Sequence, residues 1–242
     1  GVRVLMLKMN QTAASPLHDK DVRNAVAHII NYDSMAKIIG NGSTPGEAPF
    51  PPSANLGYDA IANKPMTDVA KADQILTQAG YVKNANGMYA KDGKELAITI
   101  AIWGKDTSLY EEIQQELKKA GIAVTLKKLQ SPDEVDTLGT DGFDLVERNV
   151  VTMSTNDPYW FLSLFYKTGA KSNVGGYSNP QVDALIDQLS VTFDQNERST
   201  IAKQAQQILV DDVADIYLLY PSATVVSTTK VKNVPVHPID YY

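Results

Sequence analysis

The chain has 242 residues, with 22 Lys and Arg against 28 Asp and Glu, which gives a formal net charge of −6. A surface that binds nucleic acid needs clustered basic side chains, so this acidic balance argues against that partner. The sequence contains no cysteine, which excludes disulfides, thiol catalysis and cysteine-based metal sites. With 43% hydrophobic residues the chain can form a sizeable core.

No apolar run reaches the roughly 18 residues that a membrane-spanning helix needs, so the sequence predicts none. Residues 1–6 lack the charged, apolar and small-residue pattern of a signal peptide. The chain also begins with Gly1 and not with methionine. We therefore expect a processed protein or a piece of a longer one.

The first elements are a strand and two helices. Four consecutive apolar residues predict a buried strand at 4–7. Asp19 or Asp21 then caps a helix whose apolar residues recur at helical spacing. A second helix is predicted at about 33–39 and ends at Gly40, since glycine commonly terminates helices.

Prolines and glycines interrupt the stretch from 40 to 65. Proline removes a backbone donor and blocks helix formation, so we expect a long irregular loop on the surface. An interdomain linker is the alternative. The apolar residues Phe50, Leu56 and Tyr58 favour a loop that packing holds in place.

A helix that Thr67 caps and Gly80 ends is predicted next. Asn86-Gly87 and Asp92-Gly93 are typical hairpin turns, so a small hairpin follows this helix.

The segment 96–126 predicts the fold class. Apolar and small or polar residues alternate at 96–102 and again at 122–126, which is the pattern of a strand. Between them lies a helix that begins near Thr107 and ends at Gly121. Strand, helix and strand with tight connections form a βαβ crossover, which forces a parallel pair of strands. The chain is therefore predicted to be an α/β protein.

Helix starts recur in the second half of the chain. Asp157-Pro158 and Asn179-Pro180 each place a capping residue before a first-turn proline. Asp194 with Glu197 forms another such start. Strands are predicted at 143–146, 216–220 and 224–227.

Known catalytic and metal-binding motifs are missing. His18, His28 and His237 lie in unlike contexts, without the spacing that a metal site needs. There is no Gly-x-Ser-x-Gly elbow, and 104–108 lacks the upstream glycine of a phosphate loop. We therefore predict that the chain is not an enzyme and that it binds no cofactor and builds no metal site of its own.

Several segments, in order, resemble the extracellular solute-binding proteins for peptides, nickel and opines that serve ABC importers (family 5). Pro16 to Val26 is similar to the family's "Pro, Asp, Val-Arg-x-Ala" helix entry, and Ala72 to Tyr81 to its "Ala-x-x-Leu-Leu-x-x-Ala-Gly-Tyr" pattern. The most specific run contains Gly176-Tyr177-Ser178-Asn179-Pro180, within 173–186. The remaining matching segments are 89–96, 117–122 and 143–144.

Members of this family are longer than this chain and bind their ligand between two lobes. The resemblance implies that 1–242 form a single α/β lobe, the C-terminal lobe of a type II periplasmic-binding-protein-like fold. A mixed, mostly parallel sheet flanked by helices is expected, with 40–65 as the surface loop. The implied partners are a small-molecule ligand, an N-terminal lobe missing here and an ABC permease in the membrane. The implied location is extracytoplasmic, as a periplasmic protein or a cell-surface lipoprotein.

The resemblance also suggests one wall of the ligand site. Oligopeptide-binding members have an Arg, a Trp and an Asp after the Phe-Asp strand. Arg148 matches the Arg, and its planar guanidinium suits a carboxylate. Val151 or Thr152 stands at the Trp position, and Ser154 at the Asp position that holds the peptide ammonium. Nickel-type members have a His after the next helix, where this chain has 169–171, Gly-Ala-Lys.

Further candidate ligand residues surround this segment. Polar groups at a strand end and a helix start usually face ligand in α/β sheets. Asp157 either faces the ligand or only caps its helix. Asn173, Tyr177 and Asn179 either touch the ligand or shape a turn. Trp103 either lines the ligand cleft or packs in the core. The candidate ligand-binding residues are Arg148, Thr152, Ser154, Thr155, Asn156, Asp157, Asn173, Tyr177 and Trp103.

The sequence thus favours a lobe that captures nickel or a nickel chelate, with Arg148 pairing the acid groups of the chelator. An oligopeptide is the alternative ligand within the same family. From other classes, a small α/β hydrolase or transferase, or a protein-interaction module, stays open.

Overall fold

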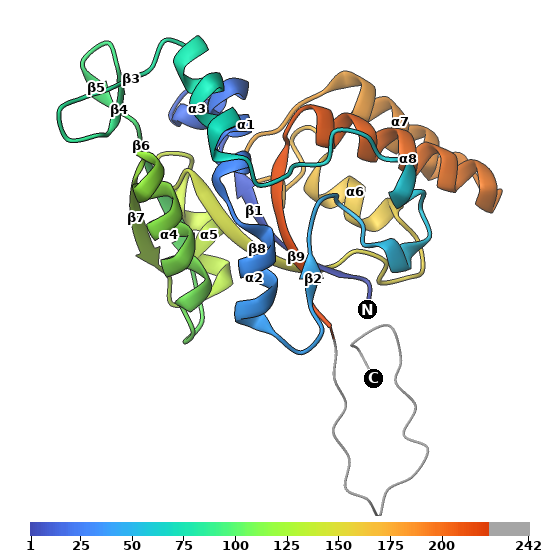
Figure 1. The fold of residues 1–242 in the computed structure, drawn as a ribbon. Coiled ribbons are helices and arrows are strands. Elements are labelled where there is room, and N and C mark those ends of the chain that lie inside the picture. The colour runs from blue at the N-terminus through green and yellow to red at the C-terminus, as the bar shows by residue number, and fades with distance from the viewer. Residues whose placement is uncertain (223–242) are drawn as a thin grey trace, which may run out of the picture.

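The computed structural model describes residues 1–222 and is built around a six-stranded sheet with the strand order β2-β9-β1-β8-β6-β7 (Figure 1). The predicted strands 224–227 and the C-terminal segment after Val231 lie outside the described residues. The strands are β1 (Arg3–Met9), β2 (Thr44–Pro45), β6 (Ala97–Ile102), β7 (Ala123–Lys128), β8 (Leu145–Val151) and β9 (Asp215–Tyr220).

The sheet is mixed. β6 pairs in parallel with both β7 and β8, as the βαβ segment predicts. β1 pairs antiparallel with β8 and β9, and β2 antiparallel with β9. These pairings give β6, β7, β8 and β9 one common direction and β1 and β2 the opposite one. The predicted α/β fold, a mixed sheet with most strands running the same way, is confirmed.

Helices cover both faces of the sheet (Figure 1). On one face β1 and β6 pack with α1 to α4, and on the other β1 and β9 pack with α6, α7 and α8. A smaller cluster joins β6 and β8 to α5. The helices are α1 (Lys20–Ile29), α2 (Tyr32–Ile39), α3 (Val69–Gln78), α4 (Ser108–Ala120), α5 (Val135–Leu138), α6 (Tyr159–Phe165), α7 (Pro180–Val191) and α8 (Gln195–Asp211), with 3₁₀ turns η1 (Pro16–His18), η2 (Pro52–Ala54), η3 (Tyr58–Ala60) and η4 (Pro132–Glu134).

The predicted hairpin forms a small separate sheet of β3 (Val82–Lys83), β4 (Tyr89–Lys91) and β5 (Lys94–Glu95). Gly87 and Gly93 have φ of 75° and 77°, the left-handed region that these turns require. In Figure 1 this hairpin projects beside α3, away from the termini.

The proline-rich loop is irregular, as predicted, and is tied to the sheet. The Tyr220 hydroxyl accepts from the Ala48 backbone N–H at 3.0 Å and donates to the Ala48 carbonyl at 2.8 Å. Phe50 is buried and packs edge-to-face on Phe161 of α6, with ring centroids 5.2 Å apart. Packing therefore holds this loop against the core, as its apolar residues predict.

Most predicted helix starts agree with the structure. Asn179 caps α7 and Asp194 caps α8 through their side chains, and Asp19 caps α1. The prediction for α3 is wrong by one residue, because Asp68 caps it and the Thr67 hydroxyl donates instead to the Ile30 carbonyl.

Candidate functional site

The carboxyl ends of β6, β7 and β8 lie at one edge of the sheet, because these three strands run in the same direction. The amino end of β1 lies at the same edge, since β1 is antiparallel to β8 and Arg3 pairs with Val151. Ligands of α/β proteins bind outside the carboxyl ends of such strands. We call this the carboxyl edge.

Arg148 and Trp103 meet near this edge. Arg148 lies in β8, and Trp103 directly follows β6, the strand beside β8. The guanidinium carbon of Arg148 lies 5.7 Å from the centroid of the Trp103 indole, within the range of a cation–π contact. Both side chains are only half-buried. The structure thus brings together two of the predicted ligand residues, a cation and an aromatic ring.

Glu147 supports this pair from the opposite face of the sheet, because successive strand residues point to opposite faces. A carboxylate oxygen of Glu147 accepts the backbone N–H of Trp103 at 3.3 Å. Burial raises the pKa of Glu147, while the bonds from Trp103 and Tyr110 and the nearby Arg148 oppose that rise. Glu147 therefore fixes the point at which the chain leaves β6 and turns into Trp103.

A second arginine lies at the same edge, and the sequence analysis missed it. Arg3, the first residue of β1, donates to both the backbone and the side-chain oxygen of Asn149 at 3.3 Å. The antiparallel register of β1 and β8 creates this contact across 146 residues, and no local pattern predicts it.

The segment after β8 divides into buried and exposed residues. Thr152 is fully buried, and both its backbone N–H and its hydroxyl donate to the Val2 carbonyl at 2.8 Å. Its hydroxyl therefore already has a partner inside the protein and ties the end of β8 to the N-terminal segment. Ser154 is half-buried, and Thr155 and Asn156 are exposed, with Asn156 at a φ of 56°.

Asp157 has two structural partners. One carboxylate oxygen accepts the backbone N–H of Tyr159 at 2.7 Å, in the first turn of α6. The other forms an ion pair with Arg198 of α8. Asp157 is thus bonded to the first residue of α6, although Pro158 and not Asp157 occupies the N-cap position of that helix.

Asn173 and Tyr177 lie at the other end of the sheet. Their segment is bonded to the residue after β1, through the Gln11 N–H and the Gly175 carbonyl at 2.8 Å. Asn173 donates to the Lys167 and Tyr177 carbonyls, and the buried Tyr177 donates its hydroxyl to Asp212 at 2.7 Å. Asn173 and Tyr177 therefore lie apart from Arg148 in this structure. They hold the turn that leads into α7.

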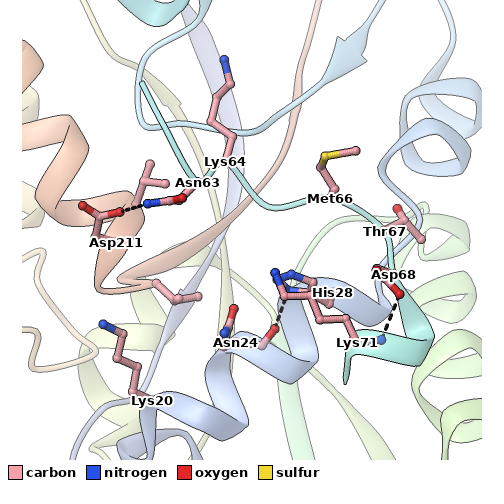
Figure 2. Close-up of a pocket in the computed structure, with 12 residues that line it drawn as sticks. Lys20, Asn24, His28, Asn63, Lys64, Met66, Thr67, Asp68, Lys71 and Asp211 are labelled. Atoms are coloured by element: carbon pink, nitrogen blue, oxygen red, sulfur yellow. Dashed lines mark hydrogen bonds between the residues drawn. The ribbon is translucent and has the colours of Figure 1, made fainter. Parts of the chain in front are cut away.

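A cavity of about 470 Å³ lies between α1, α8 and the strap 63–68 that leads into α3 (Figure 2). It contains none of the predicted ligand residues and sits toward the other end of the sheet, beside the segment that precedes β9. Among residues 1–222, no three His, Asp or Glu side chains converge in a way that could hold a metal ion. Within the same range, no helix has both the length and the apolarity needed to cross a membrane.

Comparison with known proteins identifies relatives over most of the chain. The family model of bacterial extracellular solute-binding proteins, family 5 Middle, matches residues 1–173. The nickel-binding protein NikA of Staphylococcus aureus is 28% identical over 248 residues, which cover 100% of this chain and 47% of that protein. The "Probable D,D-dipeptide-binding periplasmic protein DdpA" of Escherichia coli is 29% identical, over 98% of this chain and 45% of that protein.

A solved structure of one of these relatives also matches this chain over most of its length. The crystal structure of S. aureus NikA in complex with Ni(L-His)2 superimposes with a TM-score of 0.74 and 25% identity, over 90% of this chain and 45% of that one. The chain thus spans about half the length of the curated relatives it matches. It belongs to the bacterial extracellular solute-binding proteins of family 5.

Proposed function

We propose that the chain is one ligand-binding lobe of a solute-binding protein that captures nickel as a chelate with small carboxylic acids. The observation that carries this proposal is the Arg148 guanidinium beside the Trp103 indole at the carboxyl edge. A guanidinium binds a carboxylate through two parallel hydrogen bonds, and an indole gives an imidazole-containing or other flat chelator a face to stack on. The relative whose structure contains Ni(L-His)2 supports this choice of ligand.

The chelate fits the side chains at this edge better than a bare ion does. Arginine is always protonated and cannot ligate a metal, so Arg148 recognises the acid groups around the metal. Ser154, Thr155 and Asn156 follow β8 and can add neutral hydrogen bonds. An oligopeptide is the second candidate ligand, supported by the relative named as dipeptide-binding. Ser154 stands where peptide-binding members carry the acidic residue that holds the peptide ammonium group. This difference disfavours an oligopeptide ligand.

Capture occurs by closure in this proposal. Ligand contacts Arg148 on this lobe and a second, N-terminal lobe on its other side, and only the closed form makes both sets of contacts. A ligand that binds the closed form better shifts the population toward it. The closed protein then delivers its ligand to an ABC permease, outside the cytoplasm, as a periplasmic protein or a surface lipoprotein. Because the relatives are named as binding proteins, we propose a binding protein and not a hydrolase or transferase.

The test uses the full-length protein with both lobes. Metal analysis and native mass spectrometry of the purified protein identify what it carries, and calorimetry measures Ni(L-His)2 and a dipeptide side by side. Arg148→Ala is expected to weaken binding of the nickel chelate by about 2–5 kcal/mol, because it removes one partner of a desolvated charge pair. Lys105→Ala is the matched control, since Lys105 is an exposed cation two residues after Trp103.

Three results would contradict the proposal in different ways. Tight binding of the dipeptide with no binding of the nickel chelate would replace the ligand and keep the family function. An unchanged affinity in Arg148→Ala would remove Arg148 from the site. Turnover of a generic ester or phosphate substrate by the purified protein would favour an enzyme.

A further inference from the structure

The strap 63–68 covers one side of this cavity and is hydrogen-bonded to neighbouring helices at both of its ends. At one end the Asn63 amide donates to Asp211 of α8 at 2.9 Å. At the other, the Asp68 backbone N–H donates to the His28 carbonyl of α1 at 2.7 Å. In Figure 2 the side chains of α1 lie below the strap, with His28 near the centre of the cavity. Its volume of about 470 Å³ lies within the range of small-molecule sites.

Positively charged side chains outnumber negatively charged ones in the lining of the cavity. Three lysines, Lys20, Lys64 and Lys71, face two aspartates. Both aspartates already accept hydrogen bonds from the protein, Asp211 from Asn63 and Asp68 from the backbone N–H of Lys71 at 2.9 Å. Lys64 also has a partner, since its ammonium donates to the Tyr58 carbonyl and lies over the Tyr58 ring.

Lys20 and Lys71 differ from Lys64. Within residues 1–222, neither ammonium forms a hydrogen bond or an ion pair. An anion that enters the cavity would therefore meet two available cationic donors, whereas a cation would compete for carboxylates that amide and backbone donors already occupy.

His28 supplies the second observation that points to a ligand. The residue is only 8% exposed, and one ring nitrogen, Nδ1, is bonded to the Asn24 carbonyl at 2.9 Å. Because that carbonyl is only an acceptor, Nδ1 carries the proton, and in the neutral ring Nε2 keeps a lone pair. Nε2 has no hydrogen-bond partner within the described residues, and the ring lies in the cavity in Figure 2.

We propose that this cavity binds a small oxyanion, a carboxylate or a phosphate, between Lys20 and Lys71, and that His28 takes up a proton when the anion binds. The protonated ring donates from both nitrogens, Nδ1 to Asn24 and Nε2 to the anion, so one buried side chain links the α1 backbone to the ligand. This site is separate from the carboxyl edge and does not rest on the proposed function.

The charges around His28 set the direction of the pH dependence. Burial lowers the pKa of His28 and Lys71 of α3 lowers it further, whereas the bond to Asn24 and the carboxylate of Asp68 raise it. Lys20 of α1, Lys64 of the strap and Asp211 of α8 also line the cavity. His28 is therefore neutral at neutral pH in the empty cavity. A bound anion stabilises its charged form, so binding is tighter as the pH falls below the ordinary pKa of histidine, 6.5.

The test is calorimetry of the chain with inorganic phosphate and, separately, with citrate, at pH 5.5 and 7.5 and constant ionic strength. At least one anion is expected to bind more than tenfold tighter at the lower pH, and the arm that does so identifies phosphate or carboxylate as the ligand group. Repeating the titration in buffers of different ionisation enthalpy measures the proton uptake. Lys71→Gln is expected to weaken binding about tenfold, and His28→Gln to leave only the pH dependence that comes from the titration of the anion itself.

Controls separate this site from general charge effects and from the carboxyl edge. Lys37→Gln, an exposed lysine on α2, is expected to change nothing, and Arg148→Ala to leave anion binding intact. An NMR titration of the His28 ring in the unmodified chain tests the same point without any substitution, and its pKa is expected to rise with the anion present. No binding of either anion, equal losses in Lys37→Gln and Lys71→Gln, or an unshifted His28 titration would each overturn the proposal.

Discussion

The buried ion pair between Lys8 and Asp215 joins the two strands that begin and end the described fold, β1 and β9. The Lys8 ammonium lies 2.7 Å from an Asp215 carboxylate oxygen, and each side chain is 1% exposed. Lys8 also donates to the Phe165 carbonyl at 3.0 Å, and Asp215 accepts the Met9 backbone N–H at 3.1 Å. The ammonium lies over the Tyr166 ring, 4.2 Å from its centroid. Every partner of the pair is thus inside the protein.

Desolvation dominates the energetics of the pair. Burial raises the pKa of Asp215 and lowers that of Lys8, although each partner opposes the shift of the other. Removing one partner leaves an uncompensated buried charge, so we expect Lys8→Met or Asp215→Leu alone to reduce the free energy of unfolding by about 3–5 kcal/mol.

The double variant removes both charges and leaves the Met9 N–H and the Phe165 carbonyl without these partners, at about 1–3 kcal/mol each, and Tyr166 loses its bond to Asp215. Because apolar packing replaces two desolvated charges, we expect the double variant to be more stable than either single variant.

Urea unfolding at pH 7, followed by circular dichroism, measures these changes. At a typical slope of about 1–3 kcal/mol per M, a loss of 4 kcal/mol lowers the midpoint by more than about 1 M. The exposed pair Lys167–Asp187 is the matched control, and its removal is expected to leave the urea midpoint almost unchanged. A double variant that loses the sum of the two single losses would show that the charges act independently and would refute the reasoning.

Two further predictions concern carboxylates near the candidate site. The folded-state pKa of Glu147 is raised, so its contribution to stability is present below the ordinary value of 4.5 and is lost as the pH rises through the folded-state pKa. The melting temperature of Glu147→Gln, measured relative to that of the parent chain, should therefore rise as the pH is raised from 4 to 7. A difference in melting temperature that stays constant over this range would contradict the prediction. Asp157→Ala should cost about 1–2 kcal/mol in urea unfolding, since it removes the acceptor of the Tyr159 N–H at the start of α6 and the partner of Arg198. Unchanged stability would return Asp157 to the ligand candidates.

Local patterns predicted the parts of the fold that depend on neighbouring residues. The alternation at 96–102, the helix ending at Gly121 and the alternation at 122–126 are contiguous, so one crossover follows from one stretch of sequence. The cap at Thr67 was wrong because Thr67 and Asp68 can both cap, and a contact with Ile30, 37 residues away, decides between them.

Which other residues meet at the candidate site depends on pairing between segments that are far apart in the sequence. Arg148 meets Trp103 because β8 pairs with β6, and this could be anticipated from the resemblance and the parallel sheet together. The position of Asn173 and Tyr177 at the other end of the sheet could not be predicted, because a turn motif gives the local conformation and not the sheet edge against which it packs. Lys8 and Asp215 are 207 residues apart, and each looks like an ordinary surface charge in the sequence.

Thr152 provides a physical link between the proposed site and the proposed closure. Its backbone N–H and its hydroxyl both donate to the Val2 carbonyl, so two hydrogen bonds join the end of β8 to the N-terminal segment. The exposed residues Thr155 and Asn156 follow only three and four positions later. In a two-lobe receptor, a rotation that displaces the N-terminal segment would pull on this loop before it disturbed the packed sheet. In the proposed closure, Thr152 would thus link movement of the N-terminal segment to the loop that carries Thr155 and Asn156.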